Sequence, residues 1–317
     1  MRPLPSGMTL TSPPIPLNSA ELFALTDDGG GNALGRFRRR LKFTLRLAWN
    51  RRHLQRLQHD FAGRGVHTLL HQDVKLLLRG TRPYLWNGLA AQARFEAQTC
   101  HFDWMVQHFS APAVRAFYAA GRRPLLSLQR GGHTVSLHLQ PAYGLGREGE
   151  LELHLCLDGQ EVLRAALSVL PASCLAMSRG GQVLCVGSVQ GNRDGKEQVQ
   201  QLTALMERTR PSGLMMQALQ GLAQAWGVAA LIGVSDQGHV YAGYRGLAKR
   251  VGQRYDELWQ ELGATERCNA THWRLPMQWL ARDESEVASN KRSQLRRRNA
   301  LREQIFQACK LSALDLQ

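Results

Sequence analysis

The chain has 317 residues, 44% of them hydrophobic, and a formal net charge of +15. This apolar content suffices to bury a core, which excludes a disordered protein and indicates one large domain or two modest ones. No apolar run approaches the ~20 residues of a membrane span, and the proline-rich N-terminus lacks the apolar segment of a signal peptide. We therefore expect a cytoplasmic protein, with peripheral attachment to the inner membrane as an open alternative.

The cysteines and histidines follow no pattern typical of a metal site or a disulfide framework. No C-x-x-C pair occurs among the six cysteines, which are far apart: Cys100, Cys156, Cys174, Cys185, Cys268 and Cys309. We therefore expect reduced thiols. His101 and His108 are seven residues apart and so lie near one helical face, but no carboxylate or third ligand recurs beside them. Both are expected to pack in the core, and we predict no metal site.

The positive charge is concentrated at the two ends of the chain. Residues 1–56 hold ten Lys and Arg against three acids, and residues 287–310 hold seven against one, so these segments carry +7 and +6. Residues 57–286 hold 23 against 20, which leaves +3. This distribution indicates a polyanionic partner: an anionic membrane surface, a nucleic acid or an acidic substrate. The segments 36–56 and 291–302 are the predicted contacts.

A proline-rich stretch opens the chain, and a basic amphipathic pattern follows it. Residues 1–35 contain five prolines and the run Gly29–Gly31, so we expect a flexible tail. The next apolar residues recur at helical spacing between arginines and a lysine: Leu34, Phe37, Leu41, Leu45 and Ala48. Such a helix can lie on anionic lipid or contact phosphates. It can equally be an ordinary surface helix that packs on the domain through its apolar stripe.

After the tail, we divide the chain into three regions by period and charge. Residues 36–120 are predicted to be helical, with a break at Gly80–Pro83 and a core rich in aromatic residues. Residues 121–280 are predicted to form a mixed α/β core. Residues 281–317 are predicted to form a basic helix.

The period changes to two from Pro124, which predicts antiparallel strands. Two hairpin signals follow one another. Residues 125–130 and 133–139 flank Gly131-Gly132, and residues 150–157 and 161–170 flank Asp158-Gly159. We therefore expect a β-meander that leads into a further strand at 183–190.

The stretch 183–244 reads as a strand, two helices and a second strand. Helices are predicted at 197–208 and 212–226, and residues 228–234 form the second strand. The second helix carries an apolar stripe wide enough to lie on a sheet. We predict that the two strands are adjacent, as in a β-α-β unit, with this helix on their sheet. The expected fold class is mixed α/β.

Further helices and one short strand are expected beyond this unit. Residues 247–262 read as a helix, 271–275 as a short strand closed by Pro276, and the remainder as the basic helix. This last helix and the basic helix near the N-terminus can form one continuous patch or two separate solvated faces. Charge runs alone do not distinguish these arrangements.

Several segments, taken in order over about residues 70–310, resemble the VirK/YbjX family of Gram-negative bacteria. The segments that carry the resemblance include Arg82-Pro83-Tyr84-Leu85, Gly187-Ser188-Val189-Gln190-Gly191, Ile232-Gly233-Val234-Ser235, Tyr255-Asp256-Glu257-Leu258-Trp259 and Trp273-Arg274-Leu275-Pro276. The resemblance implies a role at the cell envelope, in surface-protein placement, virulence or tolerance of cationic peptides. It implies no agreed chemical activity.

The core also resembles the Gcn5-related N-acyltransferases. In that superfamily an Arg/Gln-x-x-Gly-x-Gly/Ala loop enters a helix whose first amides hold the pyrophosphate of acyl-coenzyme A. Residues 210–215 follow this pattern except at Met215, although Pro211 lacks an amide proton and an extra helix precedes the loop. The resemblance implies acyl-coenzyme A bound by the residues Arg210, Ser212, Gly213 and Leu214, beside Val186 and Ser188.

The same resemblance implies catalytic residues near the end of the second strand. Tyr241 or Tyr244 would protonate the leaving thiolate, and Asp236 or His239 would be the base for the acceptor, with Glu257 as a further candidate. A helix capped for structural reasons alone is equally compatible with these residues. The alternative to an acyltransferase is a non-catalytic basic adaptor whose terminal helices dock on anionic lipid or nucleic acid.

Overall fold

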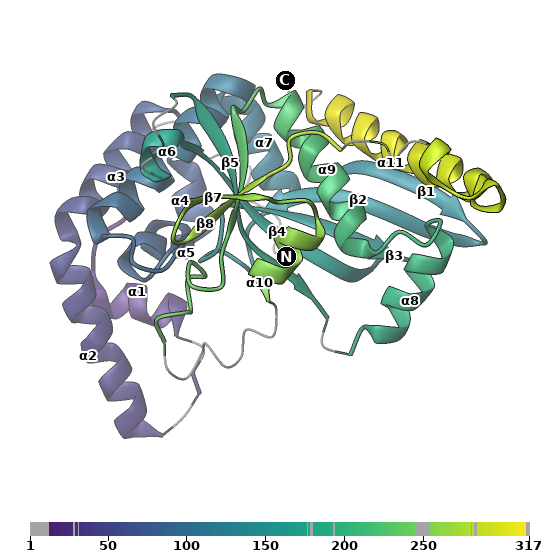
Figure 1. Cartoon of the computed structure of the whole chain (residues 1–317). Helices are drawn as coiled ribbons and strands as arrows, with labels where there is room; N and C mark the ends of the chain where they lie inside the picture. The colour runs from purple at the N-terminus through teal and green to yellow at the C-terminus, as the bar shows by residue number, and fades with distance from the viewer. Residues whose placement is uncertain are drawn as a thin grey trace.

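The protein is built around one mixed sheet of eight strands in the order β1-β2-β3-β4-β5-β6-β8-β7, flanked by helices (Figure 1). The structure is a computed structural model. It describes residues 13–27, 29–30, 32–175, 177, 180–192, 194–244, 254–279, 281 and 284–314. Only β5 and β6 pair in parallel in this sheet, and the remaining neighbours are antiparallel. The predicted mixed α/β class is confirmed.

The N-terminal region is helical, as predicted. Its elements are α1 (Ser19–Thr26), α2 (Ala33–Trp49), α3 (Arg51–Gly63), α4 (Thr68–Gln72), α5 (Val74–Leu78), η1 (Arg79–Thr81), α6 (Ala91–Phe109) and α7 (Ala111–Ala120). Helix α1 corrects part of the expected flexible tail. Asn18 caps its first turn, and Leu22 and Phe23 are buried, so packing holds a segment that its composition placed in a tail. Residues 1–12 lie outside the described residues.

The predicted meander is confirmed, with both hairpin turns at the expected residues. Its strands are β1 (Arg123–Arg130), β2 (His133–Pro141), β3 (Leu151–Leu157), β4 (Gln160–Pro171) and β5 (Gln182–Gly191), with η2 (Ala172–Leu175) before β5. The turns at Gly131-Gly132 and Asp158-Gly159 have positive φ at both central residues. Such turns match the twist of the strands that they join, which is why these sequences predicted the hairpins.

The predicted β-α-β unit is also confirmed. Helices α8 (Lys196–Leu205) and α9 (Pro211–Ala225) connect β5 to β6 (Ala230–Val234), and the pairing runs from Val183 opposite Ala230 to Val186 opposite Gly233. Helix α9 packs on β4 and β6 with most of its residues buried. Its outer side is covered by the last helix, α11 (Ser289–Leu314).

The elements after β6 complete the sheet edge. They are α10 (Tyr255–Glu261), β7 (Glu266–Asn269), β8 (His272–Leu275) and η4 (Glu284–Glu286). Strand β8 is the predicted short strand, whereas β7 was not predicted because its residues are polar and lack an alternating pattern. Of the helix expected at 247–262, residues 255–261 form α10, and residues 245–253 lie outside the described residues.

Both faces of the sheet are buried near β5. Leu184 and Val186 belong to the large core that includes α6, α7, α9 and α11, whereas Val183 and Cys185 belong to a second core with Tyr84 and its neighbours. Because successive side chains of a strand point to opposite faces, the segment around Tyr84 covers the face opposite α9. This explains why β5 is apolar from Val183 to Val186.

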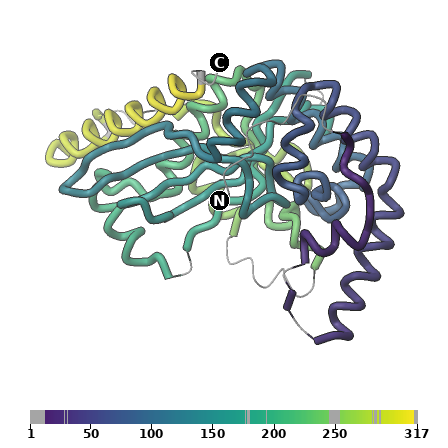
Figure 2. The backbone as a smooth tube through the Cα atoms, turned by 180° about the vertical axis from the view of Figure 1, so that it is seen from behind, coloured from purple at the N-terminus to yellow at the C-terminus, as the bar shows by residue number. Residues whose placement is uncertain are grey.

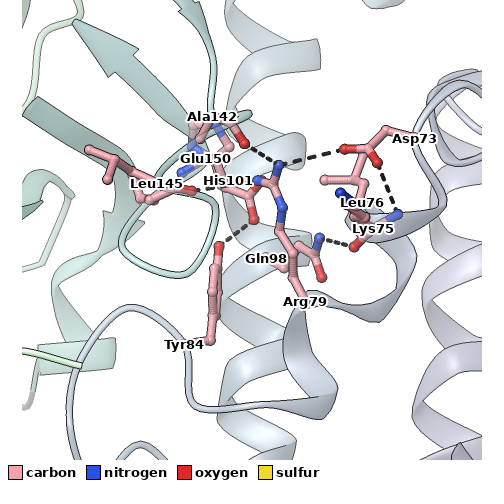
Figure 3. A network of polar contacts seen from close by, with 12 residues as sticks. Asp73, Lys75, Leu76, Arg79, Tyr84, Gln98, His101, Ala142, Leu145 and Glu150 are labelled. Carbon is pink, nitrogen blue, oxygen red and sulfur yellow. Dashed lines mark hydrogen bonds and ion pairs between the residues drawn. The ribbon is translucent and has the colours of Figure 1, made fainter. Parts of the chain in front are cut away.

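A buried polar network fixes the helical region to the loop between β2 and β3 (Figure 3). The guanidinium of Arg79 forms an ion pair with Glu150 and donates to the carbonyl of Ala142 at 2.7 Å, while the hydroxyl of Tyr84 donates to Glu150. Burial raises the pKa of Glu150 against the opposing effect of Arg79. In the same network His101 accepts from the amide of Val169 at 3.1 Å, and burial lowers its pKa to about 3. The loop that carries Glu148 is therefore held rigidly.

Candidate functional site

Helix α2 attaches to the protein through one side and exposes the apolar stripe on its opposite side. Its buried residues are Phe43 and Leu47, one turn apart on the inner side. The outer stripe is largely exposed: Leu34 57%, Phe37 63%, Leu41 50% and Leu45 61%, with Trp49 86% exposed at the helix end. The alternative that α2 packs on the domain through this stripe is therefore wrong. Large apolar side chains in one continuous exposed row are unusual on a soluble surface.

Basic residues flank this stripe. Arg36 and Arg39 lie 3.2 and 3.3 Å from the carboxylate of Asp27 at the end of α1. Arg38, Arg40 and Lys42 have no ion pair within the described residues. We call the set formed by Leu34, Phe37, Leu41, Leu45 and Trp49 with Arg38, Arg40 and Lys42 the α2 face. It is apolar along its centre and cationic along its borders, which is the pattern of a helix that lies in a membrane interface.

Helix α11, the other basic helix, lies at the opposite end of the molecule from α2 (Figures 1 and 2). The two basic segments therefore form separate surfaces, and the alternative of one continuous patch is wrong. Helix α11 packs through Leu301, Ile305 and Cys309. Gly221 of α9 allows this close contact, since a Cβ at that position would lie 2.5 Å from the carbonyl oxygen of Phe306.

A second candidate region lies where β5 and β6 separate. Their pairing ends at Val186 and Gly233, after which β5 continues along β4. The register of β4 and β5 shifts at this point, and Gly187 stands against the carbonyl of Glu148, where a Cβ would be 1.8 Å from the oxygen. A β-bulge bends the strand and re-aims the next side chain. Here the bulge turns Ser188 toward Glu148.

The carboxylate of Glu148 is the centre of a buried polar cluster. It accepts from the Ser188 hydroxyl at 3.1 Å and from the Gln190 amide nitrogen at 3.2 Å. Nε2 of His239 lies 3.4 Å from the same carboxylate, at an angle that makes no hydrogen bond. Nδ1 of His239 accepts from the amide of Tyr241 at 3.4 Å, which assigns the proton of a neutral ring to Nε2, beside Glu148. The Glu148 carboxylate and the His239 imidazole are therefore close neighbours within the cluster.

Tyrosines and one arginine surround this cluster. The ring of Tyr255 stacks on His239 at 5.2 Å, and Tyr241 lies 5.5 Å from His239. The guanidinium carbon of Arg147 is 5.8 Å from the ring centre of Tyr241. Burial raises the pKa of Tyr241, and Arg147 opposes this effect. Tyr244 is exposed and lies 6.5 Å from Tyr241, so the structure gathers His239 and both tyrosines in one region.

Helix α10 occupies the space between the separating strands. The Tyr255 hydroxyl donates to the carbonyl of Val189 at 3.5 Å, and the indole nitrogen of Trp259 donates to the carbonyl of Val234 at 2.7 Å. Both side chains are fully buried. Asp236 accepts from the amide of Tyr255 at 2.6 Å and so caps this helix. The carboxylate of Asp236 is therefore engaged by the first turn of α10.

The structure also places the residues expected to bind acyl-coenzyme A. Arg210 is exposed and pairs with Glu261 at 3.1 Å. The amides of Gly213 and Leu214 both donate to the carbonyl of Arg210, at 2.9 and 3.2 Å, and Pro211 has no amide proton. Among residues 211–214, this leaves the amide of Ser212 for an anion. Val186 lies in the buried core at the last paired position of β5.

Sequence reasoning missed Glu148 and Gln190. Glu148 lies in the loop between β2 and β3, where Gly144, Gly146 and Gly149 signal a tight backbone path. The glycines predict a loop but do not indicate which residues the Glu148 side chain contacts. The contact of Glu148 with Ser188 spans 40 residues and exists only because the meander brings the loop to the bulge in β5.

Comparison with known proteins identifies the family. A model described as "Protein of unknown function (DUF535)" matches residues 32–310. The chain belongs to the DUF535 family. The chain is 26% identical over 239 residues to the uncharacterized protein YbjX of Escherichia coli, which covers 74% of this chain and 70% of that protein. A Haemophilus influenzae protein, also uncharacterized, is 30% identical over 137 residues, 42% of this chain and 43% of its own length.

The resemblance to the VirK/YbjX family is thus confirmed. No solved structure gives a significant match. Within the part of the chain that the structure describes, no helix is both long and apolar enough to cross a bilayer.

Proposed function

We propose that this DUF535 protein is a peripheral membrane protein that docks on an anionic membrane surface through its α2 face. The observation that carries the proposal is the exposed stripe of Leu34, Phe37, Leu41 and Leu45, flanked by basic residues that form no ion pair in the described part of the chain. Insertion of such a stripe into the headgroup region buries apolar area, and each Lys or Arg near an anionic surface adds about 1 kcal/mol. A role at the cell envelope, as the VirK/YbjX resemblance implies, follows from this location.

The shape of the molecule favours this use of α2. Helix α2 projects along one end of the protein, away from α11 and from the sheet (Figures 1 and 2). Its inner side is anchored by Phe43, which packs edge-on against Phe23 of α1 at 5.6 Å. The helix therefore remains attached while its outer side meets another surface. Nucleic acid would use the arginines but would leave the apolar stripe in water, which is why we favour lipid.

Vesicle binding tests the proposal. The double variant Phe37→Ser/Leu41→Ser should bind vesicles of phosphatidylglycerol and phosphatidylcholine about tenfold or more weakly than the parent, because two apolar side chains no longer insert. Leu311→Ser is the matched control, since Leu311 is an exposed leucine, 60% accessible, on α11. It should bind like the parent. Circular dichroism and melting temperature should be unchanged in both proteins.

Two outcomes would overturn the proposal. One is a folded Phe37→Ser/Leu41→Ser variant that binds anionic vesicles as tightly as the parent. The other is a parent protein that ignores vesicles but binds duplex DNA with a steep salt dependence, which would favour the nucleic-acid adaptor.

An acyl-coenzyme A-dependent acyltransferase is the second candidate. It is favoured by the separation of β5 and β6 at Gly187 and by the Glu148–His239 pair beside Tyr241. In this hypothesis the carboxylate of Glu148, 3.4 Å from Nε2 of His239, accepts the acceptor's proton, and Tyr241 protonates the leaving thiolate. Calorimetric titration with coenzyme A, with and without Arg210→Ala, is the test. A heat of binding that is present in the parent and absent in Arg210→Ala would support the acyltransferase hypothesis. The absence of heat in the parent at millimolar coenzyme A would indicate that the fold acts as a scaffold.

A further inference from the structure

A cavity of about 660 Å³ lies beside α2, between that helix and α1. Its apolar wall includes the edge-on pair of Phe23 and Phe43, and its rim includes Leu45. Lys42 and Arg46 of α2 also line it. Because Leu45 belongs to the exposed stripe, the cavity opens next to the α2 face.

The charges around this cavity do not balance. Asp27 is an acid in the lining, and its carboxylate is already matched by Arg36 and Arg39. Lys42 has no ion pair within the described residues. Nε of Arg46 is buried and has no hydrogen-bond partner in the described part of the chain. Two positive charges of the lining therefore lack a protein counter-charge there.

The environment of Arg46 is costly for a cation. Burial lowers the pKa of Arg46, and the charge of Arg147 lowers it further. Arg46 is half-buried, and a buried Nε–H without a partner is unfavourable, so such groups are normally paired with an acceptor or an anion. An anion in the cavity would supply this partner, with the bidentate geometry that arginine offers to phosphate oxygens.

The lining of the cavity defines the class of ligand. It combines the cationic side chains Lys42 and Arg46 with the aromatic and aliphatic side chains Phe23, Phe43 and Leu45. A free inorganic anion would use only the cationic side chains. An anionic amphiphile would use both kinds.

We propose that this cavity binds a single anionic phospholipid, with its headgroup phosphate at Lys42 and Arg46 and the first acyl carbons along Phe23, Phe43 and Leu45. The inference rests on the proposed membrane docking, since the lipid enters from the surface on which the α2 face lies. It adds a specific ligand to a general electrostatic and apolar contact.

A lipid that is soluble as a monomer allows binding to the cavity to be measured separately from binding to a membrane. Dihexanoyl phosphatidic acid, titrated below its critical micelle concentration, should bind the parent protein with measurable heat. Lys42→Gln and Arg46→Gln should each weaken this binding about tenfold or more, because each removes a charged donor to the phosphate. Arg38→Gln/Arg40→Gln is the matched control, since these arginines belong to the same helix but do not line the cavity. It should bind the short lipid like the parent.

Two further measurements distinguish failure of the cavity proposal from failure of the membrane-docking proposal. Inorganic phosphate should bind at least about tenfold more weakly than the lipid, because it lacks the acyl carbons. Phe37→Ser/Leu41→Ser should lose vesicle binding yet keep the short lipid. A protein that binds vesicles through its stripe but shows no heat with the lipid would overturn the cavity proposal alone.

Further results of these titrations would support or overturn the binding of a phospholipid in the cavity. Equal affinity for phosphate and lipid would overturn the lipid assignment, as would equal losses in Lys42→Gln and in the Arg38→Gln/Arg40→Gln control. Lys42 is exposed, so Lys42→Gln should keep the fold and is decisive even if Arg46→Gln unfolds. Loss of the short lipid in a folded Lys42→Gln, together with unchanged short-lipid binding in Arg38→Gln/Arg40→Gln, would support the proposal.

Discussion

Helices α2 and α11 both combine arginines with aliphatic residues, but they use them in opposite ways. In α11 the aliphatic residues Leu301 and Ile305 are buried against the protein, whereas most of those in α2 face solvent. The arginines of the two helices differ in the same way, since those of α11 contact other parts of the protein. Arg297 of α11 pairs with Glu207 at 3.2 Å, and Arg302 lies 4.4 Å over the ring of Trp279. Thus α11 completes the fold, and α2 presents a surface.

The difference shows that the charge of a helix does not indicate its role. Helices α2 and α11 differ in whether the rest of the protein buries their apolar side chains. Helix α9 offers a surface with a glycine, Gly221, on which α11 can pack closely. The residues that helix α2 buries against the protein are Phe43 and Leu47, on its narrow inner side. Its wider apolar side is left for a partner.

The largest expected effect is on stability. Ile305→Ala in α11 should lower the free energy of unfolding by about 2–5 kcal/mol, because Ile305 is completely buried and the truncation leaves a cavity. Leu41→Ala in α2 should change it by less than about 0.5 kcal/mol. Denaturant unfolding of both variants measures the contrast. Similar losses would mean that the α2 stripe is covered by the protein itself.

The second effect is on membrane affinity and concerns the arginines. Arg38→Gln/Arg40→Gln on α2 should weaken binding to anionic vesicles by about 2 kcal/mol, or roughly 30-fold, at low salt. Arg297→Gln/Arg298→Gln on α11 removes the same charge and should leave vesicle binding nearly unchanged, since these side chains contact Glu207. Co-sedimentation with vesicles at two salt concentrations compares them. Equal losses would indicate that net charge alone drives binding.

The smallest effect concerns single arginines within α11. Arg302→Met should cost about 0.5–1 kcal/mol of stability, because it removes the cation–π contact with Trp279. Arg296→Met should cost less, since Arg296 and Glu284 are exposed and 3.8 Å apart. Chemical denaturation of the two variants tests this order. A reversed order would show that Trp279 does not hold the helix.

Local patterns predicted most elements of the fold. The sequence predicted the hairpin turns at Gly131-Gly132 and Asp158-Gly159 because such turns require residues that tolerate positive φ. It predicted β5 and β6 because a strand that is buried on both faces is rich in apolar residues. The site was only partly readable. His239 and Tyr241 were named for a resemblance, but Glu148 was not, since nothing near it points to Ser188.

Local sequence patterns were sufficient to predict the periodicity of each segment, the meander, the β-α-β unit and the basic character of both ends, because these depend on neighbours within a few turns or strands. Only the packing of the folded chain shows that α1 is buried on one side, that α10 fills the space between β5 and β6, and that the α2 stripe faces outward. An amphipathic pattern states that a helix has an apolar side. Only the surrounding surface decides whether that side is covered, because cover comes from segments far away in the chain.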